Sequence, residues 1–264
     1  MHLQEITAKV IEVSKQAGAF IRKERETFAA DKIEFKGLND LVSYVDKTAE
    51  EIIVKGLEQI LPEAGFITEE QTTTKLGERY NWIIDPLDGT TNFIHGLPVF
   101  SVSIALKEDD ELVIGVVYEV NLDECFYAWK GAPAYLNGKE ISVSNAPTIS
   151  DSLLATGFPY YDFSKQRQYI ALFTHLMKSC HGLRRLGSAA VDLAYTACGR
   201  FDAYYEYNLN PWDVAAGIVI VRQAGGHVVN YSGGDEILNS RELLATNGKL
   251  TGEMLGVIDE YFKD

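Results

Sequence analysis

The sequence predicts a mixed α and β fold, an α+β tier followed by an α/β tier, on three observations. Apolar residues near the N-terminus recur at the spacing of an amphipathic helix. Mid-chain runs rich in Val, Ile, Phe and Tyr are broken by short polar segments, as in an antiparallel meander. After Pro147, strand-like runs alternate with helical ones. Because composition changes little at this point, we expect a single unit, 1–264, with tiers at 1–146 and 147–264.

The first tier is expected to begin with two packed helices, at 2–26 and 43–61, separated by an extended segment at 33–35. Asn137-Gly138 predicts a later hairpin, because both residues tolerate the positive φ of a tight turn. Pro86 is expected to end the first strand of the meander, since proline cannot donate to the ladder. The meander strands are predicted at 81–85, 99–106, 111–120 and 124–129.

The second tier is expected to alternate between the two kinds of element. Its strands are predicted at 153–156, 183–186, 202–207, 227–230 and 242–246. Its helices are predicted at 164–178, 188–198, 211–224 and from about 250 onward. Pro211 favours a helix start, because a proline in the first turn has no N–H to leave unbonded.

Composition narrows the class of protein and its partners. The formal net charge of −14 disfavours direct binding to nucleic acid or to an anionic membrane surface, both of which would repel the chain. Cys125, Cys180 and Cys198 lack C-x-x-C spacing, which predicts neither a disulfide framework nor a zinc site. No apolar run approaches the length of a membrane span, and charges interrupt the N-terminal run. We therefore expect a cytoplasmic protein with no membrane partner.

The run at 82–93 is the most informative part of the sequence. Asp85 and Asp88 stand three residues apart at the end of an apolar stretch, and Gly-Thr-Thr follows at 89–91. The first N–H groups of a helix beginning there would have no intrahelical partner, which suits a phosphate. Two carboxylates beside such a helix start can also hold divalent cations. The alternative is an Asp-rich turn that only reverses the chain.

Three further acids lie at the ends of predicted elements. Glu69 follows a short apolar run, Asp46 lies at the start of the second helix, and Asp213 lies just after Pro211. Each alone is better explained as a helix cap or a solvated acid than as a metal ligand, because acids are favoured in the first turn of a helix. Their coincidence with the run at 82–93 favours a metal site.

These residues resemble the inositol monophosphatase family, within the lithium-sensitive, magnesium-dependent phosphatases that also include fructose-1,6-bisphosphatases. Two signatures carry the resemblance, 82–93 with His95-Gly96 beyond it, and 212–217 running on to 224–226. Supporting matches lie at 36–46, 69–70, 187–190 and 202–206, and the run at 208–211 is similar to bacterial members. The resemblance implies a layered α/β/α/β/α sandwich with the active site between the tiers, and a homodimer.

The resemblance also implies roles for individual residues. Two or three Mg²⁺ ions would be held by Glu69, Asp85, the backbone carbonyl of Leu87, Asp88 and Asp213. Such oxygen ligands suit magnesium better than zinc. Catalysis would use Glu69, which holds the ion that activates a water, and Thr90 coupled to Asp46. Phosphate would be bound by Gly89, Thr90 and Thr91, and the alcohol part of the substrate by Asp88, Ala189 and Glu206.

The expected function is Mg²⁺-dependent hydrolysis of a phosphate monoester, with myo-inositol 1-phosphate as the leading substrate. Glu206 favours a neutral polyol, since a carboxylate repels a second phosphate. Histidinol phosphate, fructose 1,6-bisphosphate and a 3′-phosphonucleotide are alternatives within the same chemistry. The alternative from a different class is a regulatory binding protein that retained the fold.

Overall fold

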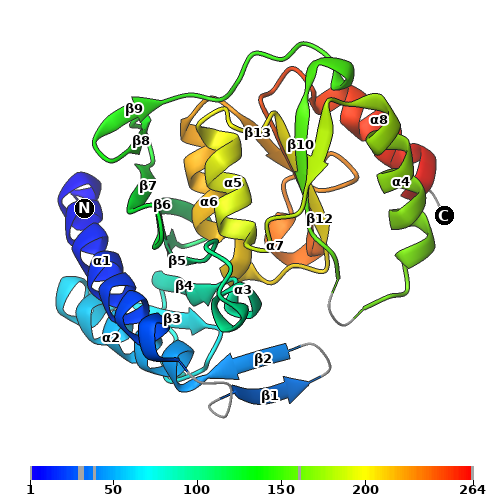
Figure 1. Cartoon of the computed structure of the whole chain (residues 1–264). Coiled ribbons are helices and arrows are strands. Elements are labelled where there is room, and N and C mark those ends of the chain that lie inside the picture. The colour runs from blue at the N-terminus through cyan, green and yellow to red at the C-terminus, as the bar shows by residue number, and fades with distance from the viewer. Residues whose placement is uncertain (1, 29–32, 38–39, 160–161, 263–264) are drawn as a thin grey trace.

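A computed structural model describes residues 2–28, 33–37, 40–159 and 162–262, with no side chain described between 29 and 42. The two larger β-sheets and three layers of helices are stacked in alternation, with helices outermost on both sides (Figure 1). This is the layered α/β/α/β/α arrangement that the resemblance implied.

The first helical layer consists of α1 (Leu3–Thr27) and α2 (Tyr44–Ile60), which pack against each other and against the first sheet. Both helices match the expected segments closely. Val10, Ala17 and Ile21 of α1 are completely buried, so the apolar stripe seen in the sequence is the face that contacts the sheet.

The first sheet has seven strands in the order β3-β4-β5-β6-β7-β8-β9. β3 pairs with β4 in parallel and every later pair is antiparallel, which confirms the predicted meander. Asn137 and Gly138, with φ of 48° and 81°, make the last turn as expected. The strands are β3 Gly65–Thr68, β4 Tyr80–Asp88, β5 Ser101–Glu108, β6 Glu111–Glu119, β7 Glu124–Trp129, β8 Ala134–Leu136 and β9 Lys139–Ile141.

Contrary to expectation, β4 does not end at Pro86. Asp85 pairs with Ser103 and Asp88 pairs with Ser101, so β4 carries one more residue than β5 between these two pairs. This is a bulge, the position within a sheet at which a proline is tolerated. The prediction was wrong because the ladder skips the proline and resumes beyond it.

The second sheet has five strands in the order β11-β10-β12-β14-β13. β10 is parallel to both of its neighbours, whereas β14 is antiparallel to both of its own. The strands are β10 Leu153–Thr156, β11 Gly182–Arg184, β12 Ala203–Tyr207, β13 His227–Val229 and β14 Glu242–Thr246. The helices are α4 Gln166–Ser179, α5 Ala189–Ala197, α6 Pro211–Gln223 and α8 Thr251–Phe262. All of these agree with the predicted alternation to within a few residues.

Short elements complete the fold. The hairpin of β1 (Ile33–Gly37) and β2 (Asp40–Ser43) precedes α2, and the short helix α3 (Thr90–His95) follows β4. The one-turn elements η2 (Ile149–Asp151) and α7 (Ile237–Ser240) were not predicted, because segments this short have no measurable periodicity.

The central layer, α5 and α6, joins the two sheets. Every residue of α6 from Val214 to Val221 is buried, as expected for a helix that is apolar on all sides. One apolar cluster contains Ile83 and Val117 of the first sheet together with Tyr204 of the second. Because a core shared in this way cannot be divided without exposing it, we propose that the two tiers fold as one unit.

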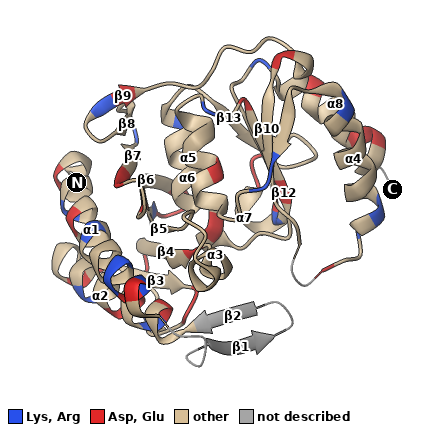
Figure 2. Cartoon of the chain, in the orientation of Figure 1, with Lys and Arg blue, Asp and Glu red and all other residues tan. Residues whose placement is uncertain are grey.

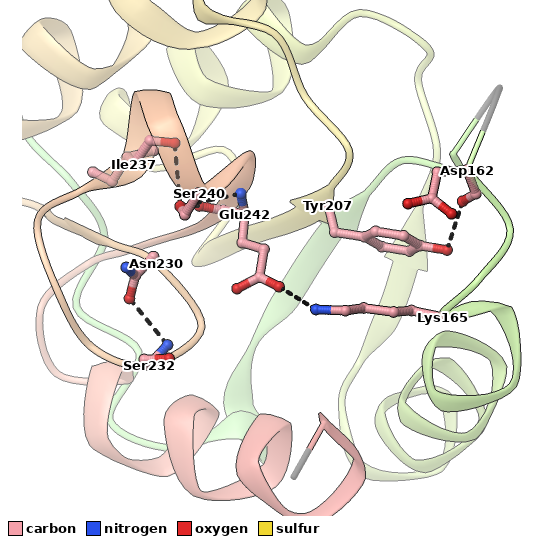
Figure 3. A network of polar contacts seen from close by, with 8 residues as sticks. All are labelled: Asp162, Lys165, Tyr207, Asn230, Ser232, Ile237, Ser240 and Glu242. Atoms are coloured by element: carbon pink, nitrogen blue, oxygen red, sulfur yellow. Dashed lines mark hydrogen bonds and ion pairs between the residues drawn. The ribbon is translucent and has the colours of Figure 1, made fainter. Parts of the chain in front are cut away.

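Polar contacts fix the segment that enters α4 against the second sheet (Figure 3). Lys165 forms an ion pair with Glu242 at 2.7 Å, and the Tyr207 hydroxyl donates to the backbone oxygen of Asp162 at 3.4 Å. These contacts come from β14 and β12. They anchor one end of the connection between β10 and α4, whose first residues line the pocket described below.

The two outer helical layers carry interspersed acidic and basic residues (Figure 2). Among the described ranges, no helix combines the length and the apolar character needed to cross a bilayer.

Candidate active site

A pocket opens between the tiers, where the end of β4 and α3 face the loops that begin α5 and α6. Every predicted site residue lines this pocket except Asp46, which lies behind Thr90. The residues that line it are Glu69, Asp85, Leu87, Asp88, Gly89, Thr90, Thr91, Gly157, Phe158, Pro159, Arg185, Gly187, Ser188, Ala189, Asp192, Glu206, Asn208, Leu209, Asn210 and Asp213. Residues far apart in sequence thus meet where the resemblance placed the site.

The bulged end of β4 shapes one wall. The Asp85 carboxylate accepts a hydrogen bond from the Leu87 N–H at 3.0 Å, which closes the bulge. Gly89 has a φ of 94°, in the left-handed region that favours glycine, and this turns the chain into α3. The first intrahelical bond of α3 runs from the Phe93 N–H to the Gly89 carbonyl, so the N–H groups of residues 90 and 91 precede it.

Thr90 is coupled to a buried carboxylate. Its hydroxyl lies 2.9 Å from one oxygen of Asp46 and 2.9 Å from the Leu87 carbonyl. The other oxygen of Asp46 accepts from the Ser43 N–H at 2.8 Å and from the Ser43 hydroxyl at 2.7 Å. Asp46 is therefore both the capping acid of α2 and the partner of Thr90. The sequence left open whether Asp46 is a helix cap or a site residue, and the two roles are compatible. Burial raises its pKa, offset by the bonds from Ser43 and Thr90.

Asp88 is held by the second tier. One of its oxygens accepts from the Ser188 hydroxyl at 2.5 Å and from the Ala190 N–H at 2.8 Å. Ser188 is the N-cap of α5, so the same short segment starts the helix and fixes the carboxylate. Burial raises the pKa of Asp88 to about 6, an effect that these hydrogen bonds oppose.

Asp213 and Glu69 complete the acidic wall from two other elements. Asp213 is the third residue of α6, and its carboxylate accepts from the Asn210 N–H at 2.7 Å in a capping box. Burial raises its pKa to about 7 despite that bond. Glu69 follows β3 directly, and its N–H donates to the Ile84 carbonyl at 3.3 Å, which places it beside the end of β4.

The pocket concentrates negative charge. Six of the side chains that line it are acidic and one, Arg185, is basic. The pKa of Asp85, which is 3% exposed, lies well above its ordinary value because of burial and then the charges of Glu69, Asp88 and Asp213. A bound cation would stabilise such a cluster, because it offsets the mutual repulsion of the buried carboxylates.

The chemistry of these donors fits Mg²⁺. They are carboxylates together with the Leu87 carbonyl, whose oxygen has two lone pairs and is not needed as the acceptor for Thr90 when that hydroxyl donates to Asp46. Within the described part of the chain, no three acidic, His or Cys side chains are already gathered around a common point as ligands. The fit therefore rests on charge and donor type.

Glu206 forms the opposite wall. The residue is 8% exposed, and its carboxyl group accepts a hydrogen bond from the Tyr204 hydroxyl at 2.5 Å. A Cβ atom on Gly157 would lie 1.8 Å from a Glu206 oxygen, so only glycine leaves room for this side chain. Burial raises the pKa of Glu206 to about 8, and the neighbouring charge of Arg185 opposes that rise. Ala189 also lines the pocket.

Sequence reasoning missed two charged residues of the pocket. Asp192 is 1% exposed, and one of its oxygens has no hydrogen-bond partner among the described residues. The only sequence signal was a single acid within the apolar run at 188–198. Arg185, whose guanidinium lies 5.5 Å from the Phe158 ring centroid, gave no signal because basic residues before a helix are common. Lys36, the first residue of the supporting match at 36–46, lies outside the described side chains.

Comparison with known proteins agrees with this geometry. The model of the inositol monophosphatase family matches residues 2–261. The chain belongs to this family. It is 39% identical to the protein named Nus factor SuhB of Escherichia coli (strain K12), over 96% of each chain. It is 35% identical to an inositol-1-monophosphatase of Mesorhizobium japonicum, over 94% of each. The crystal structure of the extragenic suppressor protein suhB from Bartonella henselae superimposes with a TM-score of 0.90 at 35% identity, covering 97% of this chain and 99% of that one.

Proposed function

We propose that the protein is a Mg²⁺-dependent phosphatase that hydrolyses a small phosphate monoester, with myo-inositol 1-phosphate as the leading substrate and inositol and phosphate as products. The observation that carries this proposal is that acids from three separate parts of the chain, Glu69, the Asp85 and Asp88 of β4, and Asp213, line one pocket beside the Thr90–Asp46 pair. The family is a phosphatase family, and one relative carries the name inositol-1-monophosphatase.

The acidic wall would hold the metal. Glu69, Asp85 and the Leu87 carbonyl would bind one ion, while Asp85, Asp88 and Asp213 would bind a second. When bound, Mg²⁺ supplies a water of lowered pKa and neutralises charge on the phosphate and the leaving alcohol. The N–H groups of residues 89–91 would donate to the phosphate oxygens, because they precede the first hydrogen bond of α3.

Thr90 would accept the proton of the attacking water. A threonine hydroxyl is a poor base, but Thr90 already donates to Asp46, so its own proton can pass to that carboxylate as it takes one from the water. The raised pKa of Asp46 makes it a stronger base than an exposed aspartate. The two bonds from Ser43 keep the carboxylate oriented during the transfer.

The opposite wall would bind the alcohol part of the substrate. Asp88 and Glu206 supply acceptors for hydroxyl groups, and Ala189 leaves space beside them. Three acids around this part of the pocket, Asp88, Asp192 and Glu206, with one Arg, disfavour a second phosphate. This supports a polyol monophosphate over fructose 1,6-bisphosphate or a 3′-phosphonucleotide.

Phosphate release from a panel of monoesters with Mg²⁺ tests the assignment of substrate. We expect the highest kcat/KM for myo-inositol 1-phosphate or a similar polyol phosphate. A tenfold preference for histidinol phosphate, fructose 1,6-bisphosphate or a 3′-phosphonucleotide, about 1.4 kcal/mol of transition-state discrimination, would move the assignment to that substrate.

A second candidate function is binding to another protein, which the name Nus factor SuhB of the Escherichia coli relative favours. The net charge of −14 argues against direct nucleic-acid binding and leaves a protein partner open. Retention of one partner by both the native protein and Asp85→Asn in a pull-down would support a binding role separate from catalysis. Failure of Asp85→Asn to retain it would count against such a role.

A further inference from the structure

Helix α2 buries a second carboxylate one turn after Asp46. Glu50 is 0% exposed, and within the described residues its hydrogen bonds come from one short segment after β3. One of its oxygens accepts from the Glu70 N–H at 2.8 Å. The other accepts from the Thr72 N–H at 2.8 Å and the Thr72 hydroxyl at 2.7 Å. A buried carboxylate with three donors is a strong local anchor.

The anchored segment begins immediately after Glu69. Gln71, between the two residues that Glu50 holds, has a φ of 53°, a left-handed conformation that costs a non-glycine residue about 1 kcal/mol or more. Such a conformation persists only where the surroundings enforce it. On its other side, Glu69 is tied to β4 by the bond from its N–H to the Ile84 carbonyl. The backbone around Glu69 is therefore fixed from both sides, by β4 and by Glu50.

We propose that Glu50 is a positioning residue for the divalent cation, which acts by fixing the backbone after Glu69 so that the Glu69 carboxylate faces Asp85. This rests on the proposed function, in which Glu69 and Asp85 hold metal. One helix then supports both halves of the site, since Asp46 orients Thr90 and Glu50, four residues later, orients Glu69.

The anchor requires a carboxylate. All the groups that face Glu50 are donors, and an ionised carboxylate offers only acceptors. In Glu50→Gln the amide oxygen can retain the two bonds from Thr72, but the NH₂ group then faces the Glu70 N–H, and two donors repel. The disturbance falls on the residue next to Glu69, whereas the volume of the side chain is unchanged.

The proposal is tested by measuring Mn²⁺ binding in the absence of substrate. Binding is detected as a loss of the electron paramagnetic resonance signal of the free ion. Mn²⁺ takes the same oxygen ligands as Mg²⁺. We expect Glu50→Gln to raise the Kd about tenfold, or about 1.4 kcal/mol. We expect Thr72→Val, which removes one donor from the loop side, to raise it about threefold. The matched control is Glu51→Gln, an exposed position on the same helix, with an unchanged Kd.

The proposal would be overturned if Glu50→Gln folds like the native protein, as judged by circular dichroism, and binds Mn²⁺ with an unchanged Kd. This holds even if the unfolding temperature of the variant is lower. If Glu50→Gln does not fold, Thr72→Val decides in the same way. Failure of the native protein itself to bind Mn²⁺ would instead overturn the proposed metal dependence. A raised Kd accompanied by recovery of kcat at high Mg²⁺ would support positioning over a purely structural role.

Discussion

Replacement of Glu206 by Gln should stabilise the metal-free protein, and the gain should grow with pH. The pKa of Glu206 is about 8 in the folded protein, against 4.5 for an unperturbed glutamate. Between these pH values the folded protein keeps a proton on Glu206 that the unfolded chain has lost. Unfolding therefore releases a proton, and rising pH favours the unfolded state. Gln is neutral in both states and avoids this cost.

The size of the gain follows from the two pKa values. It is about 1 kcal/mol at pH 5, about 3 kcal/mol at pH 7 and about 5 kcal/mol at pH 9, from 1.36 kcal/mol per pKa unit. A gain of 1 kcal/mol raises the Tm of a chain of this size by about 2–4 °C, so the difference in Tm between variant and native protein should widen by about 4–8 °C from pH 5 to pH 7. The Gln carbonyl can still accept from the Tyr204 hydroxyl, which preserves that hydrogen bond.

Urea denaturation in EDTA at pH 5, 7 and 9 measures the effect. At pH 9, where Glu206 is ionised, the same variant with Mg²⁺ should lose about tenfold to a hundredfold in kcat/KM for a polyol phosphate, since hydrogen bonds to a charged group contribute about 1.5–3 kcal/mol. A stability difference that is the same at all three pH values would refute the reasoning, as would a variant that is less stable than the native protein at pH 9.

Three further outcomes are expected. Thr90→Val should lower kcat by about a hundredfold or more, whereas Thr90→Ser should keep most of the native kcat, because only the hydroxyl is needed to pass a proton to Asp46. Equal rates for the Val and Ser variants in steady-state assays would contradict this. Millimolar Li⁺ should inhibit uncompetitively, by occupying the site of Asp88 and Asp213 while phosphate is still bound, and a competitive pattern or no inhibition would exclude that account. Sedimentation equilibrium should give a homodimer, and a mass of 29.4 kDa at all micromolar concentrations would exclude it.

Local signals in the sequence predicted most of the fold. The helices and the meander were predictable because periodicity and turn residues such as Asn137-Gly138 act over a few neighbours. The prediction that β4 ends at Pro86 was wrong because the pairing of β4 with β5 resumes beyond the proline. This pairing depends on the partner strand and not on the conformational preference of proline. The stacking of the two sheets was expected only from the family resemblance.

The same division applies to the site. The acids at 85 and 88 were identifiable because they share one short motif, and the resemblance supplied the roles expected of Glu69, Glu206 and Asp213. Glu50 and Asp192 gave no such signal. Glu50 acts on a segment about twenty residues away, and Asp192 lies within an apolar helix, so their importance depends on contacts that only the folded chain brings together.

The most direct test of the proposed activity is phosphate release from myo-inositol 1-phosphate, followed while Mg²⁺ is added to EDTA-treated protein. We expect release to depend on Mg²⁺ and to fall by about a thousandfold or more in Asp85→Asn, since loss of a group that stabilises transition-state charge costs about 10²–10³ or more in rate. Asp110→Asn, a fully exposed acid at the surface, should behave like the native protein. Absence of phosphate release with Mg²⁺ from this and every other monoester of the panel, or release that EDTA leaves unchanged, would contradict the account.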